Sequence, residues 1–194
     1  MSKRTVFLDR QHSGQIHKPH SYGAFCNIVG RHEADLTAEY LLAAERSLRE
    51  FGIAVIPISD GRYSERHARV LEYAAKAQGR TVYVAAHLNA GGGDYSCAFY
   101  DHRSKMGKNC ASHVADAMGE LPELRRSLAK PATPEDWTKN AHATIGGVYV
   151  GRPCGLCFEP CFVDNDDHKQ LLEPEGLVRI GRALAEGIHN WMEQ

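Results

Sequence analysis

Short hydrophobic runs alternate with longer amphipathic segments along most of the chain. The runs are rich in Val, Ile, Tyr and Phe, and the segments between them repeat hydrophobic residues at helical spacing. This alternation is typical of β-α-β units and predicts an α/β fold, in which a mostly parallel sheet of about six strands is flanked by helices. The expected strands are Thr5–Asp9, Ile53–Ile58, Thr81–Ala86, Cys97–Asp101, Gly147–Val150 and Gly155–Glu159.

Four segments have the hydrophobic periodicity of an α-helix. The clearest runs from Glu33 to Phe51 and is followed by Gly52, a residue common after helix C-termini. The last begins at Pro174, which suits a first helical turn, and ends at Trp191, which we expect to fill the core. The expected helices cover residues 33–51, 64–78, 105–118 and 174–191.

Two long stretches, Gln11–His32 and Ala129–Ile145, have no clear period. Stretches of this length inside a compact domain are usually functional or mobile, and the second is long enough to act as a lid.

The composition is that of an ordinary globular protein. The chain has 194 residues, which predicts one domain over residues 1–194. Lys and Arg number 23 and Asp and Glu 24, so the net charge of -1 argues against a nucleic-acid-binding protein or a polybasic membrane-surface protein. No apolar run is long enough to cross a membrane, so we expect no membrane insertion.

The six cysteines permit two interpretations. The N-terminus leads directly into the first strand without the apolar segment of a secretory signal, so we expect a cytoplasmic protein with reduced thiols. Cys154, Cys157 and Cys161 could instead hold a structural zinc ion, completed by His142 or His168. The simpler interpretation treats Cys157 and Cys161 as small apolar core residues.

Polar side chains follow several of the expected strands. His12 comes after the first strand, His87 after the third and Glu159 at the end of the last, while Glu33 opens the first helix. Ligands of open α/β sheets bind beyond the carboxyl ends of the strands. We therefore expect these four side chains to meet at one rim.

Two imidazoles and one carboxylate are the ligand set of a catalytic zinc ion with one open position. His12, Glu33 and His87 supply that set, and Glu159 is the expected general base because an apolar run precedes it and raises its pKa. Asp9 is a candidate acceptor for the N–H group of a ligating histidine.

Each of these residues also has an ordinary explanation. The chain has eleven histidines, and His32 beside Glu33 is a competing ligand candidate. Glu33 alone is typical of a first helical turn, and Glu159 alone could pair with Arg152. The zinc hypothesis therefore depends on the residues meeting.

Four segments resemble one known family in the same order along the chain. They are Val6–Gly14, Glu33–Leu36, Ala85–Ala90 and Glu159–Asn165, which contain the four residues above. The pattern is similar to the zinc-dependent N-acetylmuramoyl-L-alanine amidases of the amidase_3 type, which include bacterial cell-wall amidases and phage endolysins. Departures from the family pattern include Gln11 before the first histidine.

The resemblance implies a function and residue roles. His12, Glu33 and His87 would bind Zn2+, and Glu159 would be the catalytic acid and base for hydrolysis of the amide between N-acetylmuramic acid and L-alanine in peptidoglycan. Asn89 or His142 is a candidate to hold the oxyanion or a substrate carbonyl. Without a visible signal peptide or a separate wall-binding module, the chain resembles an endolysin that acts on the cell wall after release from the cytoplasm.

Other functions remain open at this level. A zinc amidohydrolase or carboxypeptidase acting on a small soluble amide uses a similar ligand set. A non-enzymatic module with a structural zinc on Cys154, Cys157 and Cys161 is another alternative. A thiol hydrolase based on Cys157 is disfavoured, because burial in an apolar strand makes a thiol inert.

Overall fold

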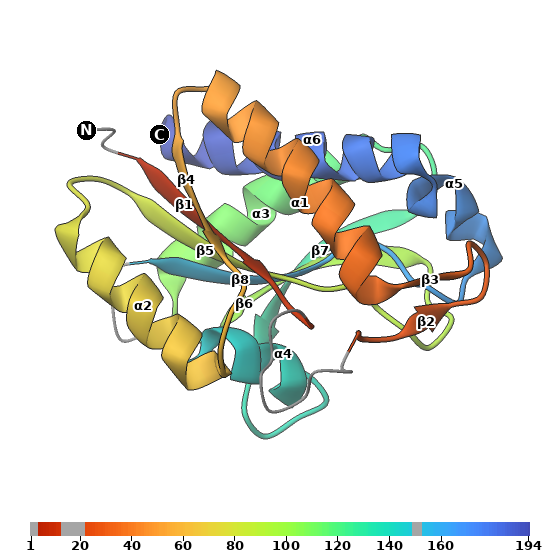
Figure 1. The fold of residues 1–194 in the computed structure, drawn as a ribbon, viewed down its shortest axis with the longest axis horizontal. Coiled ribbons are helices and arrows are strands. Elements are labelled where there is room, and N and C mark those ends of the chain that lie inside the picture. The colour runs from red at the N-terminus through yellow and green to blue at the C-terminus, as the bar shows by residue number, and fades with distance from the viewer. Residues whose placement is uncertain (1–3, 13–21, 149–152) are drawn as a thin grey trace.

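The structure is a computed structural model that describes residues 4–12, 22–148 and 153–194. The described residues form a six-stranded sheet with helices on both faces, which confirms the predicted α/β class (Figure 1). The strand order is β4-β1-β5-β8-β6-β7. In that order the strands are Ala54–Ile58, Thr5–Arg10, Thr81–Ala86, Cys154–Glu159, Tyr95–Asp101 and Arg126–Ala132.

Most neighbouring strands of this sheet are parallel. β1 runs parallel to both β4 and β5, and β5 runs parallel to β8. β6 is antiparallel to β8, and β7 follows the direction of β6. In the register of the central strands, Arg10 pairs with Ala86 and Ala86 pairs with Phe158. Consequently, the residues that follow β1 and β5 emerge beside the end of β8.

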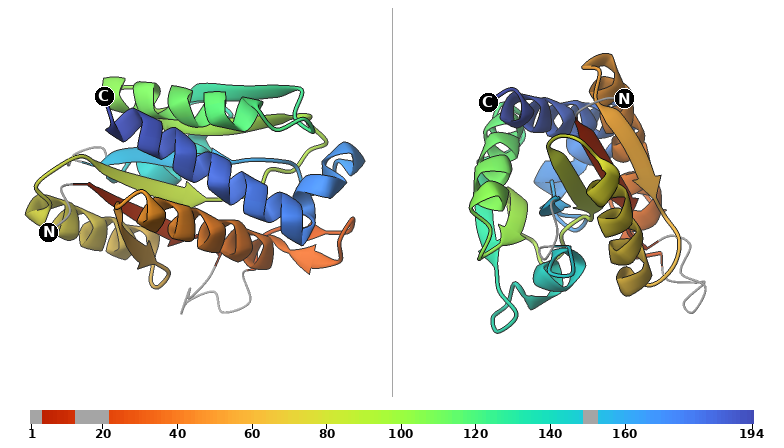
Figure 2. Two further views of the ribbon diagram at one scale, coloured as in Figure 1. Left: turned by 90° about the horizontal axis from the view of Figure 1, so that it is seen from above. Right: turned by 90° about the vertical axis from the view of Figure 1, so that its left-hand side faces the viewer.

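Three long helices cover one face of the sheet, namely α1, α3 and α6, while α2 and α4 lie on the other (Figures 1 and 2). Helix α6 packs against both α1 and α3. A small hairpin of β2 and β3 precedes α1, and a short 3-10 helix and α5 precede α6. These elements are α1 Glu33–Glu50, α2 Tyr63–Lys76, α3 Lys105–Gly119, α4 Lys139–Ile145, α5 Lys169–Leu172, α6 Pro174–Met192, β2 Phe25–Cys26 and β3 Arg31–His32.

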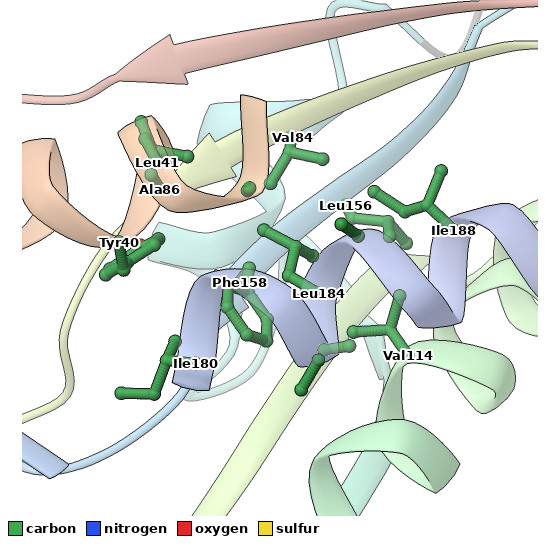
Figure 3. Close-up of a cluster of buried hydrophobic side chains, with 14 of the residues drawn as sticks. Tyr40, Leu41, Val84, Ala86, Val114, Leu156, Phe158, Ile180, Leu184 and Ile188 are labelled. Carbon is green, nitrogen blue, oxygen red and sulfur yellow. The ribbon is translucent and has the colours of Figure 1, made fainter. Parts of the chain in front are cut away.

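The larger core lies between the sheet and the three long helices. Figure 3 shows Tyr40 of α1 and Ile180 of α6 near Phe158 of β8, all of them buried. Trp191 is buried in the same core, as expected. Along β8, side chains alternate between the faces, so Phe158 points to this core and Cys157 to the smaller core under α2 and α4.

This alternation excludes the structural zinc site proposed on the cysteines. Cys154 and Cys161 belong to the larger core, whereas Cys157 belongs to the smaller core on the other face. A strand cannot aim all three thiols at one ion. All six cysteines are buried without disulfides, which supports their interpretation as small apolar residues.

The sequence prediction is wrong at one strand. Gly147 and Val148 form a turn, and Val150 lies outside the described residues. The sixth strand is instead β7, which was not predicted and carries Pro131. It forms the edge of the sheet, where proline is tolerated because one side of the strand has no neighbour to receive its hydrogen bonds. No helix in the described parts of the chain is both long and apolar enough to cross a membrane.

Candidate metal centre

His12, Glu33 and His87 converge at one point beyond the sheet. His12 lies two residues after β1, Glu33 is the first residue of α1 and His87 directly follows β5. The distance from His12 Nε2 is 3.2 Å to His87 Nδ1 and 3.4 Å to Glu33 Oε1, and His87 Nδ1 lies 3.2 Å from the same oxygen. The three side chains therefore meet at the predicted rim of the sheet. One ligand atom of each side chain faces the ligand atoms of the other two.

The spacing of these three atoms fits a zinc ion. Zinc binds imidazole nitrogen and carboxylate oxygen at about 2.0–2.2 Å in tetrahedral geometry, so two of its ligand atoms lie about 3.3–3.6 Å apart. The three distances, 3.2–3.4 Å, lie at the short end of this range or just below it. The donor set is also suitable for zinc, and three protein ligands are typical of a catalytic rather than a structural site.

The Glu33 carboxylate is fixed from both sides. Its Oε1 accepts a hydrogen bond from the backbone N–H of Leu88 at 2.9 Å, and its Oε2 accepts one from Ala24 at 3.0 Å. Burial acts to raise the pKa of Glu33, but hydrogen bonds and charge interactions with the two imidazoles hold it well below the usual range. Glu33 is therefore an anion, as a metal ligand must be.

Backbone strain occurs at the first histidine. His12 has a φ of 59°, and no other residue except glycine has a positive φ in the described parts of the chain. This left-handed conformation costs about 1–3 kcal/mol and is often found at functional sites. At the second histidine, the Tyr40 hydroxyl donates a hydrogen bond of 3.0 Å to the His87 carbonyl, which fixes the backbone there.

Glu159 faces the three candidate ligands across a cavity of about 310 Å³. Burial raises its pKa, the nearby His87 lowers it and the negative charge of Glu33 raises it further. The backbone N–H of His87 donates to the carbonyl of Phe158 at 2.9 Å. This bond joins the ends of β5 and β8, and so holds the candidate ligand His87 beside Glu159, the residue after Phe158. The predicted general base is therefore beside the candidate metal position and has a raised pKa.

Helices α2 and α4 supply much of the remaining cavity wall. Tyr63 of α2 and Asn140, Ala143 and Thr144 of α4 line it. The sequence did not single out any of them. Asn140 and Thr144 fall in the stretch Ala129–Ile145, which has no clear period in the sequence, so the length of the stretch is the only sequence signal for them.

Asp9 does not accept a hydrogen bond from His12, contrary to expectation. Its carboxylate accepts hydrogen bonds from Arg66 Nη1 at 2.6 Å, the Tyr83 hydroxyl at 2.5 Å and Gln11 Nε2 at 2.6 Å. Burial raises the pKa of Asp9, and the Arg66 guanidinium acts in the opposite direction. Asp9 therefore ties α2 to the end of β1.

Two candidate substrate-binding residues do not line the cavity. The side chain of Asn89 accepts a hydrogen bond from the backbone N–H of Ala90. His142 lies on α4 with its Nε2 atom 3.4 Å from Asp101 Oδ2. The competing ligand His32 packs between the rings of Tyr22 and Phe25 and is separate from the three-residue cluster.

Asp101, His102 and His142 form a second group with metal-ligand chemistry. The carboxylate of Asp101 is already held by Arg103, whose Nε and Nη2 atoms donate at 2.8 and 2.7 Å. Burial acts to raise the pKa of Asp101, but these bonds to Arg103 lower it below its ordinary value. A guanidinium in this position repels a cation, so this cluster is an ion-pair network and not a second metal centre.

The comparisons with known proteins find similar solved structures but no similar sequences. No protein-family model matches the sequence, and no curated protein is significantly similar to it. The CwlD amidase from Clostridioides difficile, solved in complex with the GerS lipoprotein, is 18% identical with a TM-score of 0.73, covering 98% of both chains. The N-acetylmuramoyl-L-alanine amidase AmiC2 of Nostoc punctiforme is 15% identical with a TM-score of 0.74, covering 100% of this chain and 99% of that one.

An endolysin domain is also similar. The catalytic domain of the CD27L endolysin targeting Clostridia difficile is 19% identical with a TM-score of 0.61, covering 96% of this chain and 97% of that one. Its likeness and those of the two amidases extend over nearly the whole length of each protein compared. The chain therefore has the fold of N-acetylmuramoyl-L-alanine amidase catalytic domains, the family that its sequence motifs resemble.

Proposed function

We propose that the protein is a zinc-dependent N-acetylmuramoyl-L-alanine amidase, which hydrolyses the amide between N-acetylmuramic acid and L-alanine in peptidoglycan. The observation that carries this proposal is the triangle of His12 Nε2, Glu33 Oε1 and His87 Nδ1, with sides of 3.2–3.4 Å, facing Glu159 in one cavity. The fold shared with such amidases supports the same substrate.

His12, Glu33 and His87 would hold the zinc ion. When bound, zinc with one open position acidifies water and polarises a carbonyl oxygen, which is the chemistry that amide hydrolysis requires. Glu33 contributes a negative charge that the two backbone N–H groups keep in place.

Glu159 would move the proton. As a carboxylate it accepts a proton from the attacking water, and as a carboxylic acid it donates that proton to the departing alanine nitrogen. Its raised pKa favours the second step. Tyr63 and Asn140, which line the same cavity, offer a hydroxyl and an amide group to orient the substrate.

The site of action follows from the substrate. A peptidoglycan amidase acts on the cell wall, and the endolysin domain among the structural relatives supports a lytic role for this chain. We infer an endolysin-like action, in which the protein accumulates in the cytoplasm and reaches the wall after release.

The test compares wild-type protein with Glu159→Gln on purified sacculi. The wild type should bind one zinc ion per chain and release new alanine amino termini, with the cleaved bond identified by mass spectrometry. Glu159→Gln should retain the zinc ion and release none. If the wild type leaves sacculi intact and hydrolyses N-acyl amino acids instead, the enzyme acts on small soluble amides and the peptidoglycan proposal fails.

A further inference from the structure

A cationic shelf, formed by residues of β6, of β7 and of the segment after β7, lies on the face of the sheet that carries Glu159. We define the shelf as Tyr95, Lys130 and Trp137. The Lys130 ammonium lies 4.9 Å from the ring centroid of Tyr95 and 4.9 Å from that of Trp137. Trp137 is 63% exposed, although its edge contacts the buried Phe99. The shelf therefore presents a positive charge between two aromatic rings, one of them largely open to solvent.

Strand register places the shelf on the same face of the sheet as Glu159. Cys97 pairs with Glu159 across β6 and β8, and Phe99 pairs with Lys130 across β6 and β7. Paired residues point to the same face, and Cys97 and Phe99 both belong to the core under α4. Adjacent strands are about 4.8 Å apart, so β7 lies about 10 Å from the strand that carries Glu159.

The Lys130 ammonium has no carboxylate partner in residues 4–12, 22–148 and 153–194. Arg126, four residues earlier on the same strand, also lies over the ring of Tyr95, but it forms an ion pair with Asp94. Lys130 is half-buried, and aromatic rings replace part of the water that an ammonium would otherwise bind. A pre-positioned, unpaired cation of this kind favours an anionic ligand.

The chemistry of the proposed substrate indicates which anion binds. In muramyl peptides, the lactyl carboxyl group of the sugar is consumed in the scissile amide, so the free carboxylates lie on the peptide stem. An extended peptide advances about 3.3–3.6 Å per residue, so the second stem residue comes within reach of the long side chain of Lys130, whose strand lies about 10 Å from β8.

We propose that Lys130 binds the carboxylate of the second residue of the peptide stem, with Trp137 and Tyr95 packing against the stem. This inference rests on the proposed amidase function. It makes Lys130 a specificity-determining residue that distinguishes an acidic stem from one whose carboxylate is amidated.

The experiment measures binding of two N-acetylmuramoyl dipeptides that differ only at this group. One carries L-alanine and D-glutamate with a free α-carboxylate, and the other carries the α-amide. In both ligands the γ-carboxyl group is blocked as a methylamide, so that the α position is the only difference in charge. Both are titrated by calorimetry into zinc-loaded Glu159→Gln protein, which prevents turnover. A charge-assisted hydrogen bond predicts that the acid binds about tenfold to 100-fold more tightly than the amide.

Variants of Lys130 complete the test. Lys130→Met retains the alkyl packing and should remove the preference for the acid, whereas Lys130→Arg should keep it. Lys108→Met, which removes an exposed lysine on α3, is the matched control and should leave the preference unchanged. Thermal melting of each variant identifies loss of folding.

Equal affinity for acid and amide, a preference that survives Lys130→Met, or no binding of either ligand would overturn the inference. The amidase proposal is judged separately, by the release of amino termini from sacculi by the wild type. Retained acid preference without that release would contradict the amidase function and leave a carboxylate-binding site.

Discussion

Arg66 and Asp9 form an ion pair with no solvent access, in which Arg66 Nη1 lies 2.6 Å from Asp9 Oδ1. The same Nη1 atom donates to the carbonyl of Arg10, and Arg66 Nη2 donates to the carbonyl of Ser59. The guanidinium thus holds the carboxyl ends of β1 and β4 together, two residues before His12.

Arg66→Met should lower the free energy of unfolding by about 3–5 kcal/mol, because it leaves the Asp9 charge buried without its partner. Urea denaturation followed by circular dichroism measures the change. The double variant Asp9→Asn/Arg66→Met should recover part of the loss, since the buried charge is then absent. A loss of less than about 1 kcal/mol for Arg66→Met would show that the pair contributes little.

His12→Ala and His87→Ala should each reduce zinc from one ion per chain to a substoichiometric amount, because each removes one of three protein ligands. The matched control is His32→Ala, whose ring packs between Tyr22 and Phe25 and should leave zinc binding unchanged. Metal analysis of dialysed protein gives the readout. Full zinc content in both ligand variants would contradict the assigned centre.

Elements with a local pattern were predictable from the sequence. The expected helix from Glu33 had its start correct because acidic residues and hydrophobic spacing identify a first turn without reference to the rest of the chain. The strand Thr81–Ala86 was predicted with its observed bounds, since it is a continuous buried run in the centre of the sheet. Both elements carry or precede a candidate ligand, so the convergence of the three candidate ligands could be anticipated.

Features that depend on distant contacts were not predictable. Strand β7 combines Arg126, Lys130 and Pro131, and only its place at the sheet edge makes that sequence compatible with a strand. Helix α4 has seven residues, too few for a hydrophobic period to identify it. Consequently, neither the orientation of His142 toward Asp101 nor the cavity wall from α4 could be inferred.

The rate of amide hydrolysis should fall as the pH is lowered, because Glu159 becomes protonated. Burial raises its pKa above the ordinary glutamate value of 4.5. The ionised form is the base, so kcat/KM should decrease as the pH falls through this raised pKa, with a midpoint above 4.5. Glu33 does not titrate in this range, since its pKa is held well below the usual value.

The measurement is a pH profile of amide hydrolysis with zinc content determined at each pH. If activity is lost at low pH while the zinc content stays constant, the decrease in kcat/KM is assigned to protonation of Glu159. If the activity follows zinc release at every pH, the decrease reports protonation of the histidine ligands and the assignment to Glu159 is wrong.

Gly23→Ala should weaken zinc binding through Glu33. Gly23 has a φ of +75°, and a Cβ atom at this position would lie 2.4 Å from Glu33 Oε2, so the carboxylate would have to move. Gly30→Ala is the matched control, because Gly30 has a φ of +68° and a Cβ atom there would meet nothing within 4 Å. Both variants should lose about 1–2 kcal/mol of stability from the left-handed backbone. Only Gly23→Ala should raise the zinc dissociation constant, by about tenfold or more, as measured by competition with a chelator. An equal zinc affinity in the two variants would show that the carboxylate tolerates displacement, and that its two backbone hydrogen bonds are not what holds the ligand in place.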